Sequence, residues 1–250
     1  MSINDGFLKE DEIVFYLDNR KVKDLSNNLK QLLRALFGIV DDEEIVKCEK
    51  TIDFIKPDIV ITYKGVKKYV SIKTGRSEIF HQEIVENFVS YLKEKGISDK
   101  TIETFLLYHY GDGTVDGSAD ERIEYNELRL LLNTRIKHAN FELNINKAFI
   151  QEVIDRCLFV GTLENAIPAD AIYEGDYQFG KIVTRDQIKK YIDKKYWGWL
   201  NNLHIGPLQF RPHARYYNTE IKSEKKRHEL ICYWCHFSAD LDYICRHINY

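Results

Sequence analysis

The feature that most constrains the fold is a pair of short apolar segments joined by a Lys-Gly turn. Residues 57–63 contain Ile59, Val60 and Ile61 in a row, and residues 67–73 alternate between apolar and polar side chains. Successive side chains of a strand point to opposite faces of a sheet, so Ser71 and Lys73 share one face. A two-residue turn favours antiparallel pairing of the strands that it joins. The sequence therefore predicts a β-hairpin in this part of the chain.

Hydrophobic periodicity predicts the elements around this hairpin. Apolar residues recur at helical spacing in residues 24–38 and 77–95, whereas residues 44–54 and 101–110 are typical of strands. The expected order is helix, three strands, helix and strand, which gives an α/β fold with a mixed central sheet flanked by helices. Further along the chain, the expected elements are helices over residues 122–138, 147–160 and 185–195 and strands over residues 208–217 and 230–237.

No linker or repeat divides the chain, so we expect a single domain over residues 1–250. Within it, we expect a catalytic core over residues 15–115 and an α+β C-terminal extension over residues 116–250. Residues 181–250 hold 13 Lys+Arg and 7 Asp+Glu, whereas residues 1–180 hold 23 and 32. A basic final quarter indicates a face for a polyanion, which makes the extension the expected DNA-recognition part. The sequence pI of about 6.3 argues against a protein that coats DNA constitutively and non-specifically.

Composition and cysteine usage predict a cytoplasmic protein that does not enter a membrane. Of 250 residues, 44% are hydrophobic and 30% are charged, as in soluble globular proteins. The apolar runs are far shorter than a membrane span, and the first ten residues lack the apolar region of a secretory signal. The 5 Cys are an odd number and are scattered along the chain, so we expect reduced thiols.

The hairpin carries residues suited to phosphodiester hydrolysis. Asp58 begins its first strand and Lys73 ends its second, so antiparallel pairing places them close together. Hydrolysis of a phosphodiester uses a hard cation held by oxygen ligands, which Asp58 can supply to Mg²⁺. It also uses a group that positions or deprotonates water, and a Lys with a lowered pKa can do this. We expect Ser71 to support the site by hydrogen bonding.

The string Pro57-Asp58 followed, after 12 residues, by Ser71-Ile72-Lys73 resembles the motif of the PD-(D/E)xK nuclease superfamily. The resemblance covers residues 24–110 and is closest to type II restriction endonucleases. It implies a restriction-endonuclease-like αβββαβ core that cleaves double-stranded DNA with Mg²⁺, for which Mn²⁺ can substitute. The superfamily usually has Asp or Glu where this chain has Ser71. In a subset with Ser or Thr at that position, the helix that follows donates the second carboxylate.

Glu86 matches the position of that displaced carboxylate, because it lies 13 positions after Lys73 within the expected helix over residues 77–95. The resemblance therefore implies Asp58 and Glu86 as the Mg²⁺ ligands. On a helical wheel Gln82 and Glu86 lie beside the apolar stripe, whereas Glu83 points to solvent. Gln82 is the alternative to Glu86, as a contact to water or phosphate.

The expected DNA contacts are basic side chains after the hairpin and in the C-terminal quarter: Arg76, Arg211, His213, Arg215, Lys225 and Lys226. Three of them, Arg211, His213 and Arg215, alternate and would share one face of a strand. Arg reads guanine edges, and basic turns bind phosphates. The alternative is a solvated edge strand whose charges prevent aggregation. Because cutting both strands of a symmetric site takes two active sites, we expect a homodimer.

Two alternatives to a restriction endonuclease stay open. One is a repair or recombination nuclease that acts on branched or single-stranded DNA. The other is a protein of the nuclease fold that binds nucleic acid or a protein without cutting, because the carboxylate at Ser71 is lost.

Two further metal patterns are incomplete. Residues 112–123 have Asp and Gly at several positions of a calcium loop but lack its final Glu. Cys232 and Cys235 have the spacing of a zinc site and could be joined by Cys245 and His247. The alternation expected for residues 230–237, however, places Cys232 and Cys235 on opposite faces of a strand.

Overall fold

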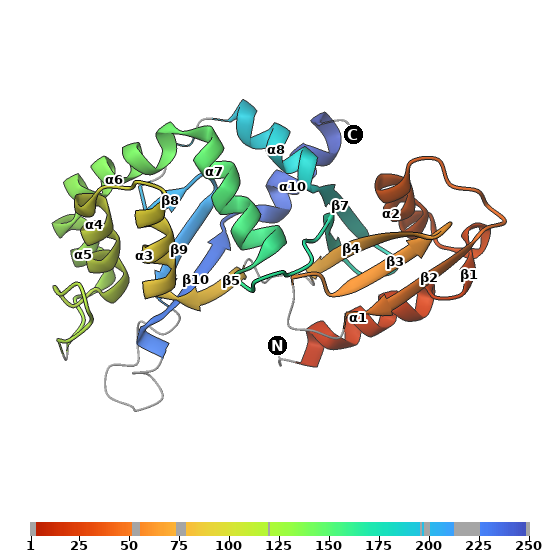
Figure 1. Cartoon of the computed structure of the whole chain (residues 1–250), viewed down its shortest axis with the longest axis horizontal. Helices are drawn as coiled ribbons and strands as arrows, with labels where there is room; N and C mark the ends of the chain where they lie inside the picture. The colour runs from red at the N-terminus through yellow and green to blue at the C-terminus, as the bar shows by residue number, and fades with distance from the viewer. Residues whose placement is uncertain are drawn as a thin grey trace. The chain divides into compact units, whose positions relative to one another are not determined.

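The computed structural model describes residues 4–51, 56–73, 79–119, 121–195, 197, 201–212 and 226–248. The chain forms two compact units, each assembled from separate stretches of sequence (Figure 1). Unit 1 comprises Met1–Ser77, Asp155–Lys194 and His236–Tyr250, and unit 2 comprises Glu78–Ile154 and Lys195–Cys235. The two units therefore interleave along the chain, whereas the sequence predicted a core and an extension that meet near residue 115.

Unit 1 is built on a six-stranded sheet with the order β1-β2-β3-β4-β6-β7. Its strands are β1 (Arg20–Lys21), β2 (Ile45–Lys50), β3 (Ile59–Tyr63), β4 (Val66–Lys73), β6 (Ala171–Gly175) and β7 (Gly180–Thr184). Strands β4 and β6 are parallel, and the other neighbours are antiparallel. The predicted hairpin is confirmed as β3 and β4, whose turn residues Lys64 and Gly65 have φ values of 47° and 78°. Two positive φ values give the turn type that suits the twist of a two-residue hairpin.

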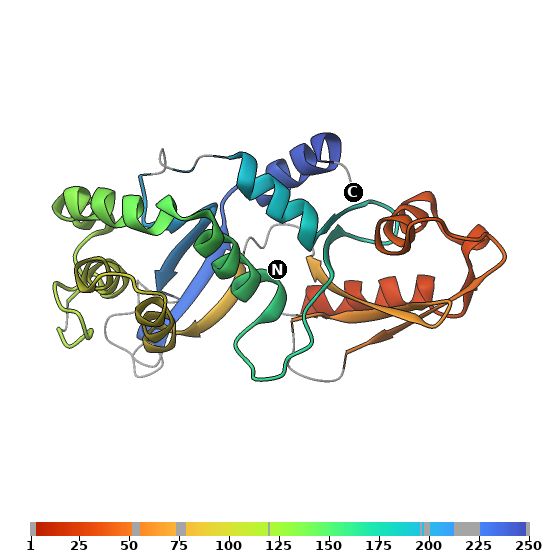
Figure 2. The ribbon, with the colours of Figure 1, turned by 45° about the horizontal axis from the view of Figure 1, so that its top comes forward.

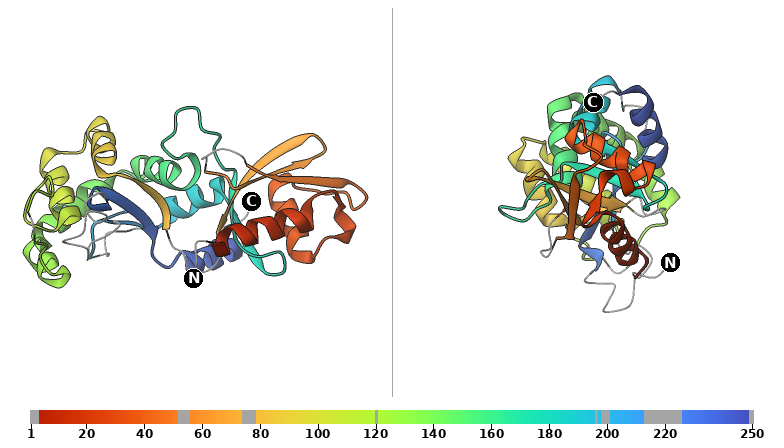
Figure 3. Two further views of the ribbon diagram at one scale, coloured as in Figure 1. Left: turned by 90° about the horizontal axis from the view of Figure 1, so that it is seen from below. Right: turned by 90° about the vertical axis from the view of Figure 1, so that its right-hand side faces the viewer.

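Helices cover the sheet of unit 1. On one face lie α1 (Asn4–Leu17), the 3₁₀ turn η1 (Val22–Asp24) and α2 (Asn27–Phe37), and Figure 3 shows α1 along the strands. The core on this face joins side chains of α1 and α2 to alternate strand residues: Ile13, Leu17, Leu29, Leu32, Ile59, Ile61, Val70 and Ile72. Ile172 and Val183 point to the other face and are fully buried. The π-helix η2 (Asp155–Val160), α8 (Arg185–Lys194) and α10 (Phe237–His247) complete unit 1, and α8 and α10 contact β7. The predicted mixed sheet flanked by helices is confirmed.

Unit 2 contains a second, antiparallel sheet with the order β5-β10-β9-β8 (Figure 2). Its strands are β5 (Ile79–Ile84), β8 (His204–Ile205), β9 (Leu208–Pro212) and β10 (Glu229–Trp234). Its helices are α3 (Val85–Glu94), α4 (Asp99–Tyr110), α5 (Tyr125–Leu131), α6 (Asn133–Ile145) and α7 (Lys147–Ile154). Phe88 of α3 packs on Phe105 of α4 and Phe210 of β9, with ring centroids 5.4 and 4.8 Å away. This aromatic cluster joins the helices to the sheet.

Two predicted elements are wrong, and both lie at the start of unit 2. Residues 79–84, expected to begin a helix, form β5 because they pair with β10 from far along the chain. Residues 101–110, expected to be a strand, belong to α4. Ser98 caps this helix by accepting a hydrogen bond from the backbone of Thr101, and Gly111 ends it in the left-handed conformation. A short apolar run suits either structure, and here the caps favour the helix.

The strand that lies beside β4 is therefore β6, supplied by residues 171–175 rather than by residues 101–110. Between β4 and β6 the chain forms much of unit 2 and returns through η2. Among the described helices, none combines the length and the apolar character needed to cross a membrane.

Candidate active site

The carboxylate of Asp58 is held at the start of β3 by the neighbouring strand. Its Oδ2 atom accepts hydrogen bonds from the backbone N–H of Ile72 at 2.6 Å and from the Ser71 hydroxyl at 3.1 Å. The backbone N–H of Asp58 also donates to the Val70 carbonyl at 2.9 Å, which continues the hairpin ladder. Ser71 itself is buried, with 2% of its surface exposed. The hairpin register therefore fixes the orientation of this carboxylate. Both of these hydrogen bonds to the Asp58 side chain are accepted by the same oxygen, Oδ2.

Lys73 ends β4 close to two carboxylates. Burial lowers the pKa of Lys73, and the negative charges of Asp58 and Glu10 oppose that change. Asp58 and Glu10 therefore both interact electrostatically with the ammonium group of the half-buried Lys73. A lysine of lowered pKa beside two carboxylates is an arrangement found at catalytic sites more often than at ordinary surfaces.

Glu10 of α1 is the second carboxylate of this site. Only 16% of its side chain is exposed, and its Oε2 atom lies 3.1 Å from the Lys50 ammonium group, which also lies 3.1 Å from Asp11. Burial raises the pKa of Glu10, and the charges of Asp58 and Asp11 raise it further, against the effect of Lys50. Two carboxylates from different elements therefore repel each other at the end of the hairpin.

Sequence reasoning missed Glu10, although a signal was present. Ile13 and Leu17 are fully buried, and Glu10 precedes them at intervals of three and seven residues. These intervals place Glu10 on the same side of a helix as the two apolar residues. A carboxylate on the buried side of an amphipathic helix calls for a functional or ionic explanation.

The structure places Glu86 in the other unit, at the first turn of α3. Its Oε1 atom accepts a hydrogen bond from the Tyr110 hydroxyl at 2.9 Å and lies 2.8 Å from Nδ1 of His228. Although burial raises it, hydrogen bonds from the α3 backbone, His228 and Tyr110 hold the pKa of Glu86 below its usual value. The count of 13 positions after Lys73 assumed one helix over residues 77–95. Strand β5 interrupts that helix, so the spacing argument for Glu86 fails.

The same strand changes the orientation of Gln82 and Glu83. Gln82 is exposed and donates a hydrogen bond to Glu229 of β10 at 2.9 Å. Glu83 points inward, with 3% of its side chain exposed, and its Oε1 lies 2.9 Å from Nε2 of His81. The prediction that Glu83 faces solvent is wrong, because alternation in a strand replaces the helical wheel on which it rested.

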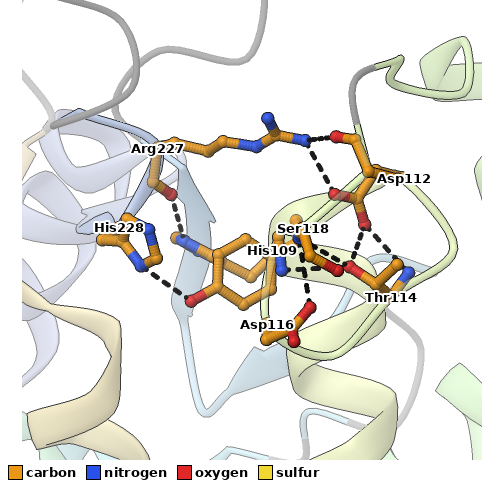
Figure 4. A network of polar contacts seen from close by, with 10 residues as sticks. His109, Asp112, Thr114, Asp116, Ser118, Arg227 and His228 are labelled. Atoms are coloured by element: carbon orange, nitrogen blue, oxygen red, sulfur yellow. Dashed lines mark hydrogen bonds and ion pairs between the residues drawn. The ribbon is translucent and has the colours of Figure 1, made fainter.

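The calcium-like loop after α4 is held by contacts within unit 2 (Figure 4). Oδ2 of Asp112 accepts a hydrogen bond from the Arg227 guanidinium at 2.7 Å, and both side chains are buried. Oδ1 of Asp112 accepts hydrogen bonds from the backbone N–H and the hydroxyl of Thr114. Asp116 accepts a hydrogen bond from the backbone of Ser118 at 3.1 Å. Asp112 and Asp116 therefore shape the loop, and Asp112 also ties it to Arg227, which comes shortly before β10.

Two of the remaining predicted DNA contacts lie in unit 2, and the other four lie outside the described residues. Arg211 is exposed on β9, with its guanidinium 4.9 Å from the centre of the Tyr233 ring, and Lys226 is also exposed. Arg76, His213, Arg215 and Lys225 lie outside the described residues.

The possible zinc ligands are divided between the units. Cys232 and Cys235 belong to unit 2, whereas Cys245 and His247 belong to α10 of unit 1. Cys245 donates a hydrogen bond to the Ile182 carbonyl at 3.4 Å. Within the described ranges, no three or more His, Cys, Asp or Glu side chains are grouped so that they could bind a metal ion. Around Asp58 the described carboxylates are therefore a pair rather than a larger cluster.

Comparison with known proteins adds one partial likeness. No protein-family model matches the chain. The chain is 27% identical over 129 residues to fructose-bisphosphate aldolase 1 of Paracoccidioides lutzii. The matched region covers 44% of this chain and 36% of the aldolase, so the chain spans little more than a third of that protein. A likeness of this extent assigns no family, and the functional argument depends on the site in unit 1.

Proposed function

We propose that this protein is a metal-dependent DNA endonuclease whose active site lies at the end of the β3–β4 hairpin. The observation that carries the proposal is the meeting of Asp58, Glu10 and Lys73, in which one lysine of lowered pKa interacts with two carboxylates. Phosphodiester hydrolysis needs oxygen ligands for a cation and a group that acts on water, and these three residues can supply both.

The topology of unit 1 supports this proposal. The order α2, β2, β3, β4, η2, β6 follows the αβββαβ order of restriction-endonuclease-like cores, with the chain of unit 2 inserted before η2. The sheet order β2-β3-β4-β6, with β4 parallel to β6, places Asp58 and Lys73 on central strands. In mixed sheets of this kind, ligands commonly bind beyond the carboxyl ends of parallel strands.

The donor set fits Mg²⁺, with Mn²⁺ as a substitute. Mg²⁺ commonly binds through one or two carboxylates and completes its shell with water and phosphate oxygens. Asp58 and Glu10 would hold the ion, which would offset two causes of the raised pKa of Glu10, burial first and then the charge of Asp58. When bound, such an ion polarises the phosphate and makes water a better nucleophile. Glu10 thus takes the role that the sequence resemblance assigned to Glu86.

The chain's own residues would orient the reaction. Ser71 and the Ile72 N–H hold Oδ2 of Asp58 and so fix the orientation of the carboxylate that would bind the ion. The lowered pKa of Lys73 increases its neutral fraction, and a neutral amine accepts a proton from water. Lys50 beside Glu10 and Asp11 would limit the negative charge that a phosphate meets on entering.

We assign DNA binding in part to unit 2. Arg211 is exposed on β9 and stacks over Tyr233 of β10, which orders its guanidinium. An ordered arginine can donate two parallel hydrogen bonds to a phosphate or to a guanine edge. Exposed Lys226 would contribute a phosphate contact. The proposed substrate is double-stranded DNA, and branched or single-stranded DNA is the alternative within the same chemistry.

The proposal is tested by digestion of plasmid, linear and branched DNA with Mg²⁺ or Mn²⁺, with EDTA and the Lys73→Met variant as controls. Discrete fragments that need the metal and disappear in the variant are the expected result. Cleavage confined to branched or single-stranded DNA would favour a repair nuclease. DNA binding without cleavage in either metal would reject the nuclease activity and leave a nucleic-acid-binding protein.

A separate prediction concerns Glu10. Glu10→Gln is expected to weaken Mg²⁺ binding by at least about tenfold, because it removes a charged ligand.

The raised pKa of Glu10 also means that the folded protein binds the proton of this carboxyl group more tightly than the unfolded chain does. Stability should therefore fall as pH rises from 4.5 through the raised value, and the variant should lose this dependence.

Titration calorimetry with Mg²⁺ and urea unfolding at several pH values measure the two effects. Asp11→Asn is the matched control, because Asp11 contacts the same Lys50 ammonium group but is 61% exposed. Equal Mg²⁺ affinities for Glu10→Gln and Asp11→Asn would remove Glu10 from the site.

A further inference from the structure

Helices α5 and α6 follow each other directly in unit 2, separated by Leu132, whose φ of −93° and ψ of 1° leave the helical range; we call the two helices together the rod. Leu132 joins them, since its N–H donates to the Leu128 carbonyl at 2.9 Å and its carbonyl accepts from Ile136 at 2.8 Å. Both bonds have helical spacing. The buried side chains follow one stripe through both helices: Leu128, Leu132, Ile136, Ala139, Asn140 and Leu143. This stripe faces the rest of unit 2, where α6 contacts α4, α7 and β8.

The opposite face of this rod is apolar and exposed. Its large side chains are Leu130, Leu131, Phe141 and Ile145, which are 77%, 63%, 69% and 66% exposed. At about 100° per residue, all four lie within one half of the helix circumference. Three exposed polar residues, Thr134, Lys137 and His138, lie between the two apolar pairs. We call this surface the α5–α6 face.

Single exposed apolar residues are common, but four on one face of one rod are not. The two apolar pairs of each copy together expose roughly 400–500 Å² of apolar surface, divided by the polar residues between them, and apolar surface on this scale often marks an interaction site. These exposures also mean that none of the described segments covers the face. The surface therefore has the size and composition of an interface.

We propose that the α5–α6 face binds the same face of a second copy of this chain, with the two rods antiparallel. The pattern is self-complementary about its polar centre. With a two-fold axis near residue 136, Leu131 of one copy faces Phe141 of the other, and Thr134 faces His138. The two-fold axis repeats the contact between Leu131 and Phe141, so it occurs twice in the dimer. The two contacts together bury both apolar pairs of each copy, as in an isologous interface.

Antiparallel packing is favoured over parallel packing by charge. Parallel rods would align two helix dipoles side by side, which is unfavourable, whereas antiparallel rods place the dipoles in opposition. Together the two faces bury about 1,000 Å² of apolar area, and flanking polar residues bring the total near the lower limit of stable interfaces. We therefore expect a reversible dimer. This inference does not depend on the nuclease activity.

Sedimentation velocity over a concentration series, without DNA or metal, tests the proposal. Wild-type protein should self-associate reversibly, and Leu131→Glu and Phe141→Lys should each weaken association by more than about tenfold. The double variant Leu131→Glu/Phe141→Lys should restore it, because in the antiparallel register the new carboxylate of each copy meets the new ammonium group of the other. Ile39→Glu, which changes an apolar residue that is 98% exposed in unit 1, is the matched control and should change nothing.

Three outcomes would overturn the inference. A wild-type chain that stays monomeric at about 100 µM would reject the interface, since reversible dimers are populated at this concentration. A dimer unaffected by either single variant would place the interface elsewhere. Loss of association in both single variants without recovery in the double variant would reject the antiparallel register. Circular dichroism checks folding, and the milder pair Leu130→Ser and Ile145→Ser probes the same face if a charged variant unfolds.

Discussion

Replacing Lys73 with Met is expected to slow DNA cleavage by about 10²–10⁴-fold, the usual contribution of a positioned acid–base group. Methionine keeps the length of the side chain but cannot position or deprotonate water. DNA affinity should change little, because one cation of this site is lost while unit 2 is unaltered. Single-turnover cleavage at saturating DNA and Mg²⁺, together with fluorescence anisotropy of labelled DNA, separates the two effects.

The pH dependence gives a sharper form of this prediction. Burial lowers the pKa of Lys73 below 10.5, so the wild-type rate should rise with pH as the amine loses its proton. The Met variant should lose this rise. Lys67→Met is the matched control, because Lys67 lies in the same strand and on the same face but is exposed. Wild-type rates for Lys73→Met would show that the site has been assigned incorrectly.

Replacing Glu83 with Ala is expected to lower the free energy of unfolding of unit 2 by about 3 kcal/mol, because it breaks a buried pair that involves an ionisable group. Glu83 and His81 are only 3% and 7% exposed, and their contact is 2.9 Å long. The substitution leaves the His81 ring without this acceptor in a place that water does not reach. The helical wheel over residues 77–95 instead predicted that Glu83 faces solvent.

Urea unfolding followed by tryptophan fluorescence measures this effect in unit 2 alone. All 3 Trp residues lie between positions 195 and 235, within unit 2. Gln82→Ala is the matched control on the adjacent, exposed position of β5, where we expect a loss below about 0.5 kcal/mol. Equal losses for the two variants would mean that the His81–Glu83 pair contributes nothing to stability.

The sequence predicted best those parts of the fold that are determined locally. The β3–β4 hairpin follows from alternation and from a turn in which both residues have positive φ. Strand β5 could not be predicted in this way, because its pairing partner β10 lies about 150 residues further along the chain. Within residues 79–84 the apolar pattern suits a helix or a strand, and the distant pairing determines the outcome.

The same distinction applies to the site. Asp58 and Lys73 belong to one hairpin, so their proximity could be predicted from the turn between them. Glu10 reaches them only because α1 packs on the sheet, which depends on core contacts of Ile13 and Leu17. Glu86 was chosen by counting along a helix that strand β5 interrupts. Residues brought together by tertiary packing leave little trace in local sequence.

The interleaving of the two units has a consequence for synthesis of the chain. A ribosome produces β4 about 100 residues before β6, its parallel neighbour, so β4 has an open edge while the polypeptide of unit 2 emerges. An open edge can pair with other nascent chains, and parallel pairing over such a separation is slow. Unit 1 also includes α10, which contacts β7 and comes after β10 of unit 2 in the chain. The sheet of unit 1 is therefore completed only after most of unit 2 has been synthesised.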